Sequence, residues 1–379
     1  MEAKESSNLD LVRAVAVLCV FAAHFRDLIT GTGAHISWAI GQMGVLIFFV
    51  HTSLVLMMSL ERSARKLKGR ILVADFYVRR FFRIYPLSIV VVTVAFLELV
   101  PTRLDPWPWS TYISNLALTL NLTYSEHMWW GLWTLPLEVQ MYVALPFLFL
   151  WLRERAFGWA LAMWAVAVAV GVLQPYVSQR LSIGQYGPCF VAGVVAWRLM
   201  HTVRARYRGA LWPLVFGATT SIWLIAPRHD ATFYRWAFCL ALGCAIPWFR
   251  ELRWTPLVVV AGVIAKYSYG IYLSHAAIIR FALTLDGLER WVTLIALVVS
   301  VPVAMFHLIE QPMIALGRRL ARQATQSAVV RDPSSVSILH KSWSLSQVVR
   351  TIFQRVWLLI PMILSTSEVE LTLEAVAVL

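Results

Sequence analysis

Charged residues are scarce in this chain of 379 residues: Asp, Glu, Lys and Arg make up 14% of it, and 59% of the residues are hydrophobic. Soluble domains contain roughly 25% charged residues, so a soluble protein of this length could not cover its surface with polar groups. The apolar content and the lack of a short repeat also exclude a disordered or fibrous protein. The 18 Trp residues suit the boundary between bilayer and water, where indole rings are enriched. The composition therefore predicts a polytopic membrane protein.

Cysteine is scarce as well. The four thiols form no CxxC pair and no disulfide framework, so we interpret them as small hydrophobic residues. Metal-ligand spacing is also lacking, and we expect no metal. A net charge of +13 is also typical of proteins that bind nucleic acid. In membrane proteins, however, Lys and Arg gather in cytoplasmic loops beside anionic lipid, so we expect a lipid bilayer and no nucleic acid as partner.

Ten apolar runs approach the length needed to cross a hydrocarbon layer of about 30 Å. They lie near residues 9–29, 37–60, 78–100, 132–152, 158–175, 184–201, 211–226, 232–249, 256–281 and 291–314. With a cytoplasmic N-terminus, the inner side holds 20 Lys and Arg residues and the outer side seven. The opposite orientation would reverse this bias. We therefore predict an all-α bundle of about ten transmembrane helices with both termini in the cytoplasm.

This prediction divides the chain into two parts. Residues 1–320 form the transmembrane domain, and residues 321–379 form a cytoplasmic tail. Within the tail, residues 348–364 are apolar but interrupted by charges, so they are a candidate interfacial helix.

Ionisable side chains inside membrane spans are costly and therefore candidates for function. Arg13 and His24 are eleven residues apart, so they share one helix face and lie roughly 16 Å apart along the axis. Arg80 and Arg83 share a side at the cytoplasmic end of the third span, where guanidinium groups suit phosphates. Pro86 is expected to end this segment. The alternative roles are membrane anchoring for the arginines and packing for His24.

Later spans carry further polar side chains. Glu138 lies below the outer boundary of the fourth span, near the depth inferred for His24, and could orient an imidazole or a sugar hydroxyl. Ser268, Tyr272 and His275 share one face of the ninth span, and Glu310 ends the tenth. The alternative role for each is a structural hydrogen bond between helices.

Taken together and in this order, these segments resemble the acyltransferase 3 family of integral membrane acyltransferases over residues 8–320. The segments that carry the resemblance are Asn8-Leu-Asp-Leu-Val-Arg13 with His24, Gly44-Val-Leu-Ile-Phe-Phe49, Arg80-Phe-Phe-Arg83-Ile-Tyr-Pro86, Trp133-Thr-Leu-Pro-Leu-Glu138, Ser268-Tyr-Gly-Ile-Tyr-Leu-Ser-His275 and Glu310-Gln-Pro312. One segment departs from the family pattern. Where the family often has Phe-Phe-Val-Leu-Ser-Gly, this chain has Phe48-Phe-Val-His51-Thr52-Ser53. Close packing at Ser53 is then in doubt, and His51 has no assigned role.

The resemblance implies transfer of an acyl group, usually acetyl, from acyl-CoA to a carbohydrate hydroxyl at the bacterial inner membrane. The acceptor would be a cell-surface polysaccharide, lipopolysaccharide or another glycoconjugate, including glycolipids. Arg80 and Arg83, together with Arg13, would bind the CoA phosphates from the cytoplasm. His24 would act as general base or carry the acyl group covalently, and Glu138 would orient the base or the acceptor. Residues that would support the site or the acceptor are Ser268, Tyr272, His275 and Glu310.

A second class of function uses the same side chains. A proton-coupled transporter also needs ionisable residues within its spans. Such transporters often have broken helices at corresponding positions of two halves, and this sequence shows no such pair. The enzyme is therefore the favoured interpretation.

Overall fold

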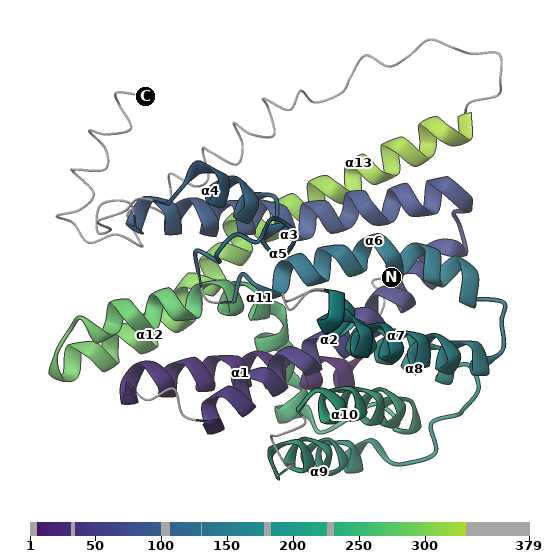
Figure 1. Ribbon diagram of the computed structural model, residues 1–379, viewed down its shortest axis with the longest axis horizontal. Coiled ribbons are helices and arrows are strands. Elements are labelled where there is room, and N and C mark those ends of the chain that lie inside the picture. Colours follow the sequence, from purple (N-terminus) through teal and green to yellow (C-terminus); the bar gives the residue numbers. More distant parts are fainter. Residues whose placement is uncertain are drawn as a thin grey trace.

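The computed structural model describes residues 6–31, 35–99, 107–129, 131–177, 183–225 and 231–330. Within these ranges the regular structure is helical, apart from an isolated bridge between Tyr207 and Phe249. The long helices lie side by side, mostly along the long axis of the molecule (Figure 1). The predicted all-α class is confirmed.

The helices follow the predicted apolar runs. They are α1 (Ser7–Thr30), α2 (His35–Ala64), α3 (Gly69–Leu99), α4 (Trp109–Leu116), α5 (Leu120–Thr123), α6 (Thr134–Leu152), α7 (Phe157–Val177), α8 (Ile183–Leu199), η1 (Gly209–Leu211), α9 (Trp212–Ile225), α10 (Ala231–Ala245), η2 (Ile246–Trp248), α11 (Thr255–Leu283), α12 (Gly287–Met305), η3 (Phe306–Glu310) and α13 (Gln311–Val330).

Seven helical segments of the described chain are long and apolar enough to cross a membrane: α1, α2, α3, α6, α7, α11 and the continuous stretch that begins with α12. Helices α8, α9 and α10 have 17, 14 and 15 residues, fewer than the roughly 20 that a full span usually needs. The protein is thus a multi-pass membrane protein. The count of ten spans and the cytoplasmic termini stay predictions.

The centre of the bundle is built around α2. Helix α1 packs against α2 and α11, and α8 packs on α2 as well. A Cβ at Gly44 would lie 2.5 Å from the carbonyl oxygen of Ala16, so glycine is needed where α1 meets α2. A Cβ at Gly193 of α8 would lie 2.8 Å from the Cβ of the fully buried Ser53. Close packing at Ser53 is therefore retained, because the glycine stands on the partner helix.

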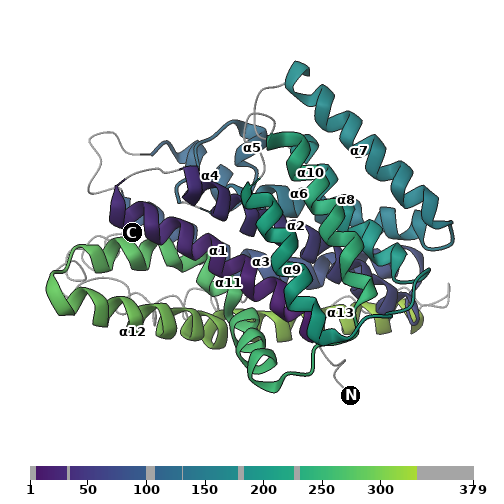
Figure 2. The same ribbon diagram turned by 90° about the horizontal axis from the view of Figure 1, so that it is seen from below.

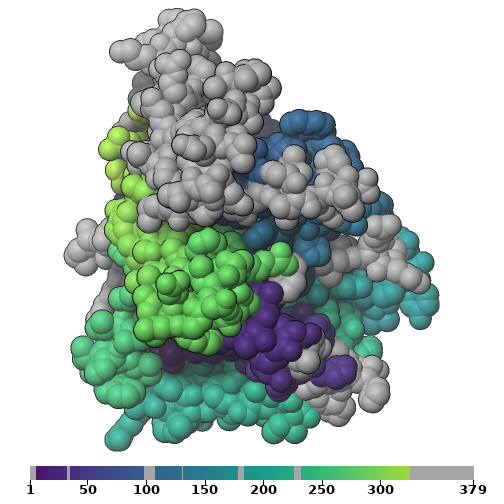
Figure 3. Space-filling model, turned by 90° about the vertical axis from the view of Figure 1, so that its left-hand side faces the viewer, coloured from purple at the N-terminus to yellow at the C-terminus, as the bar shows by residue number. Residues whose placement is uncertain are grey.

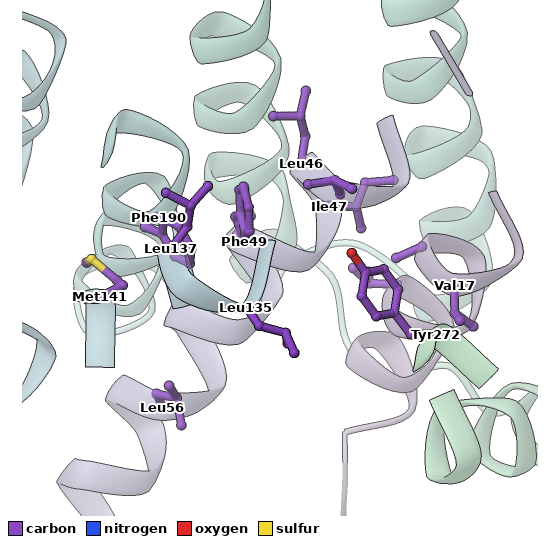
Figure 4. Close-up of a cluster of buried hydrophobic side chains, with 14 of the residues drawn as sticks. Val17, Leu46, Ile47, Phe49, Leu56, Leu135, Leu137, Met141, Phe190 and Tyr272 are labelled. Carbon is purple, nitrogen blue, oxygen red and sulfur yellow. The ribbon is translucent and has the colours of Figure 1, made fainter. Parts of the chain in front are cut away.

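An apolar cluster fills this centre. Leu46, Ile47 and Phe49 of α2 are fully buried, and the Phe49 ring stacks on Phe190 of α8 with centroids 4.2 Å apart. Figure 4 shows Tyr272 of α11 on the other side of the cluster. The cluster thus holds α2 rigidly in place, and α2 can form one side of a polar site. Farther out, α7 and α12 lie at opposite edges of the bundle (Figure 2).

One predicted boundary differs from the structure, and the division of the chain after residue 320 stays a prediction. Helix α3 runs through Pro86 to Leu99, so the expected stop at Pro86 is wrong. Proline is tolerated within membrane helices, and Pro86 stands inside a continuous helix here. Tyr269 of α11 donates a hydrogen bond to the carbonyl of Ile84 at 2.9 Å, which ties α3 to α11 next to the proline. Helix α13 continues past residue 320 to Val330. The rest of the predicted tail, with the candidate helix at 348–364, lies outside the described residues.

Residues 107–129, which lie between α3 and α6 in the chain, fold around one buried amide. Asn115 of α4 is fully buried, and its amide group donates to the carbonyls of Thr111 and Glu126, both at 2.9 Å. Its side-chain oxygen accepts from the backbone N–H of Met128 at 3.2 Å. Figure 3 shows this end of the bundle, where α4 (blue), α1 (purple) and α12 (green) share one face. The segment is therefore an ordered cover over this end.

Candidate active site

A cavity of about 100 Å³ lies among α1, α2, α3, α6 and α11. Its apolar wall comes mainly from α2. The polar side chains that line it are Arg13, His51, Thr52, Arg80, Arg83, Thr134, Glu138, Tyr142, Ser268, Tyr269 and Tyr272. Six of the nine predicted site residues are thus brought to one place from four helices.

Arg13 points into this cavity. Its Nε donates a hydrogen bond to the Oγ of Ser268 at 2.6 Å, and Ser268 in turn donates to the carbonyl of Ala265 at 2.8 Å. The charges of Arg83 and Glu138 also act on Arg13. Because the side chain is held within the bundle, the geometry does not match that of an arginine that reaches toward the bilayer surface.

Arg83 and Arg80 have different surroundings. Arg83 forms an ion pair with Glu310, whose side chain is 0% exposed. Arg80 has no ion-pair partner in the described chain, and its Nε is buried without a hydrogen bond there. Arg80 also lines a second, smaller hollow beside Asp75 and Arg79 at the ends of α2 and α3. Arg80 therefore connects the central cavity with that end of the bundle.

Glu138 lies among the arginines. Its carboxylate accepts a hydrogen bond from the hydroxyl of Tyr142 at 3.0 Å. Helix α6 begins inside the bundle, since its first residue, Thr134, is 4% exposed. Glu138, one turn further along, is consequently level with Arg13. The expected match in depth between Glu138 and His24 is not seen.

His24 lies beyond the cavity lining, against His275. The two imidazole rings have centroids 5.1 Å apart. Tyr272 stands between this pair and the cavity: its ring centroid is 6.1 Å from that of His275 and 5.8 Å from that of Phe48, which lines the cavity. The site thus has two parts, a cavity with arginines and a histidine pair, and Tyr272 contacts both.

Two hydrogen-bond partners in and before α6 hold the hydroxyl group of Tyr272 in place. Its OH donates to the carbonyl of Gly131 at 3.0 Å and lies 2.6 Å from the Oγ1 of Thr134. Gly131 has φ of +93°, a conformation that favours glycine. The turn before α6 therefore fixes the position of the side chain that separates the two parts.

Several lining residues had no predicted role. Tyr142 is four residues after Glu138 and shares its helix face, a spacing that could have indicated the contact. Tyr269 and Thr134 gave no such signal. His51 is 5% exposed and lies in the cavity near the charge of Arg13.

In the described part of the chain, no group of three His, Cys, Asp or Glu side chains could hold a metal ion.

The family profile described as an acyltransferase domain matches residues 6–309, a range that includes every residue lining the cavity. The chain belongs to the acyltransferase 3 family. This acyltransferase is also similar to nodulation protein 10 of Rhizobium leguminosarum bv. viciae, with 26% identity over 360 residues, which cover 82% of this chain and 94% of the relative. No solved structure matches the chain. The resemblance found in the sequence is confirmed, and the protein is a membrane O-acyltransferase.

Proposed function

We propose that this acyltransferase moves an acetyl group from cytoplasmic acetyl-CoA to a hydroxyl of a carbohydrate across a bacterial inner membrane. The acceptor class is a cell-surface polysaccharide, lipopolysaccharide or another glycoconjugate. The main support is the convergence of Arg13, Arg80, Arg83 and Glu138 around one small cavity within the bundle, with Glu310 paired to Arg83. The relative's name assigns it to nodulation, and its source is bacterial.

The donor would enter at the end of the bundle where Arg80 lines both hollows. Its guanidinium can take a phosphate of CoA, since guanidinium groups bind phosphates through parallel hydrogen bonds. Three arginines against two carboxylates leave an excess of positive charge for this anion. The cavity of about 100 Å³ has room for a few water-sized groups, which suits a short acyl chain.

The chemistry requires one proton acceptor. The acceptor hydroxyl oxygen attacks the thioester carbonyl carbon, and the carbon–sulfur bond breaks. His24 takes the hydroxyl proton as general base and returns it to the CoA thiolate. A variant of this route passes the acyl group through a covalent bond to His24. Either route brings the thioester to Tyr272, which contacts both parts of the site.

Glu138 would act on the donor side of Tyr272. Because it lies level with Arg13, about three helical turns from His24, it does not touch the hydroxyl whose proton His24 takes. Its carboxylate can instead accept a hydrogen bond from an N–H or O–H of the bound donor while Tyr142 holds its other edge in place. Ser268 supports Arg13, and Glu310 supports Arg83.

Mass spectrometry of surface glycans from source cells with and without the protein tests this function. We expect loss of acetyl groups from one glycan when the protein is absent, with restoration by the reintroduced chain. In parallel, the purified protein in vesicles should transfer label from acetyl-CoA to that glycan. An unchanged set of glycans, together with transfer only to a non-carbohydrate acceptor, would overturn the proposal.

A further inference from the structure

His275 is held in the interior beside His24. Its side chain belongs to α11, which packs along α1. The contacts of Arg13 with Ser268 and of His24 with His275 show that the two helices run in the same direction. The imidazole planes are inclined by 36° at a centroid distance of 5.1 Å, so the two rings are neighbours. His275 is 2% exposed and therefore faces protein rather than lipid.

The backbone fixes the tautomer of His275. Its Nδ1 lies 2.8 Å from the carbonyl oxygen of Tyr272 and 3.1 Å from that of Ile271. Carbonyl oxygens only accept hydrogen bonds, so neutral His275 carries its proton on Nδ1. Its Nε2 is then an acceptor. This atom is buried and has no hydrogen-bond partner among the residues that the structure describes.

We propose that His275 is a positioning residue for His24. When His24 turns one N–H toward it, the Nε2 of His275 accepts this hydrogen bond and so selects the His24 tautomer whose other nitrogen can take a proton. This inference rests on the proposed function of His24 as the base. A neutral imidazole has two tautomers, and the one that presents an N–H to the acceptor hydroxyl could not act as a base.

In this mechanism His24 is the only histidine that gains and then loses a proton. When His24 takes the hydroxyl proton, both of its nitrogens carry hydrogen, and the one that faces His275 keeps its acceptor. The other proton passes to the CoA thiolate, which restores the starting tautomer. His275 neither gains nor loses a proton in this cycle, because its Nδ1–H stays bonded to the backbone carbonyls.

One other group competes for the same role. Asp27, on the next turn of α1, acts on His24 through its charge. Its Oδ1 is buried without a hydrogen-bond partner in the described chain. Asp27 could accept the His24 N–H in place of His275, so the two residues have to be changed separately.

Three variants of the full-length protein in membranes separate these roles. His275→Phe keeps a ring and removes Nε2, whereas His275→Gln offers an amide oxygen at similar reach. Asp27→Asn removes the competing charge. Turnover is measured with labelled acetyl-CoA and the glycan fraction of cells that lack the protein, and acetyl-CoA binding is measured on the same preparations as a check of folding.

We expect His275→Phe to lower kcat about 10- to 100-fold, as loss of a partner that orients a histidine does elsewhere, with the KM for acetyl-CoA unchanged. His275→Gln should recover most of that loss, and Asp27→Asn should have the smaller effect. Equal losses in the Phe and Gln variants, a wild-type kcat in His275→Phe, or a larger loss in Asp27→Asn would overturn the inference. Retained transfer in His24→Ala would instead overturn the proposed base itself.

Discussion

Arg83 of α3 is paired with the buried carboxylate of Glu310 in η3, whereas Arg80, one turn earlier on the same helix, has no such partner in the described chain. The two arginines of one sequence motif therefore differ in whether a protein carboxylate balances their charge. Arg83 neutralises a protein charge, and Arg80 is available to a ligand. The first two predictions separate these roles.

Replacing Arg83 should destabilise the protein. Arg83→Ala leaves the carboxylate of Glu310 buried without its counter-charge, and breaking a buried ion pair costs about 3–5 kcal/mol. We expect a clearly lower Tm of the detergent-solubilised protein. The double variant Arg83→Ala with Glu310→Gln should recover part of the loss, because it removes the unpaired charge. A wild-type Tm for Arg83→Ala would contradict this role.

Replacing Arg80 should weaken donor binding without lowering the Tm to the same extent. A charge-assisted hydrogen bond to phosphate contributes about 1.5–3 kcal/mol, so the KM for acetyl-CoA should rise roughly 10- to 100-fold. Arg153→Ala is the matched control, since Arg153 pairs with Glu154 at 2.8 Å and lines neither hollow. Equal effects of the two substitutions on KM would show that only the general positive charge matters.

His24→Ala should abolish transfer while acetyl-CoA still binds. His24 does not line the cavity that holds the arginines, so its loss leaves that cavity intact. A general base contributes about 10²–10⁴-fold to the rate. Single-turnover transfer and equilibrium binding of labelled acetyl-CoA, measured on the same preparation, test this. Loss of binding in parallel with transfer would assign His24 to the donor site.

Tyr142→Phe should lower kcat by about ten-fold, because the Glu138 carboxylate loses a hydrogen bond that is stronger for a charged acceptor. The control is Tyr77→Phe, whose hydroxyl donates to the carbonyl of Val143 at 2.8 Å outside the cavity. Both variants remove one hydroxyl from a tyrosine, so their kcat values from steady-state kinetics can be compared directly. Similar kcat values in the two would exclude a functional contact between Tyr142 and Glu138.

The sidedness of the two substrates gives a fifth prediction. In intact cells, a membrane-impermeant thiol reagent should label Ser110→Cys on the exposed surface of α4 and leave Lys66→Cys, in the turn before α3, unlabelled. Acetyl-CoA enclosed in sealed vesicles should acylate a glycan supplied only outside. A requirement for both substrates on the cytoplasmic side would refute transfer across the membrane and leave the family assignment intact.

The sequence alone located the three arginines and the carboxylate that line the cavity, because a charge within an apolar run is costly and therefore conspicuous. It did not locate the hydroxyl groups of Thr134 and Tyr269, since such residues occur throughout membrane helices without a functional role. The depth of Glu138 was also missed. The depth of Glu138 follows from where α6 begins. The first residue of α6, Thr134, contacts Tyr272 inside the bundle, and hydropathy does not reveal this contact.

The π-helical turn η3 lies between α12 and α13, and the number of its residues determines which way the side chains after it point. Such a turn holds one residue more than a regular helix, and one residue corresponds to a rotation of about 100°. Deleting a residue from Phe306–Ile309 would turn Glu310 away from Arg83. It would also turn Gly317 away from Phe82, where a Cβ would lie only 2.6 Å from the Phe82 Cβ. Conservative substitutions at Phe306–Ile309 should therefore be tolerated far better than a single-residue insertion or deletion there.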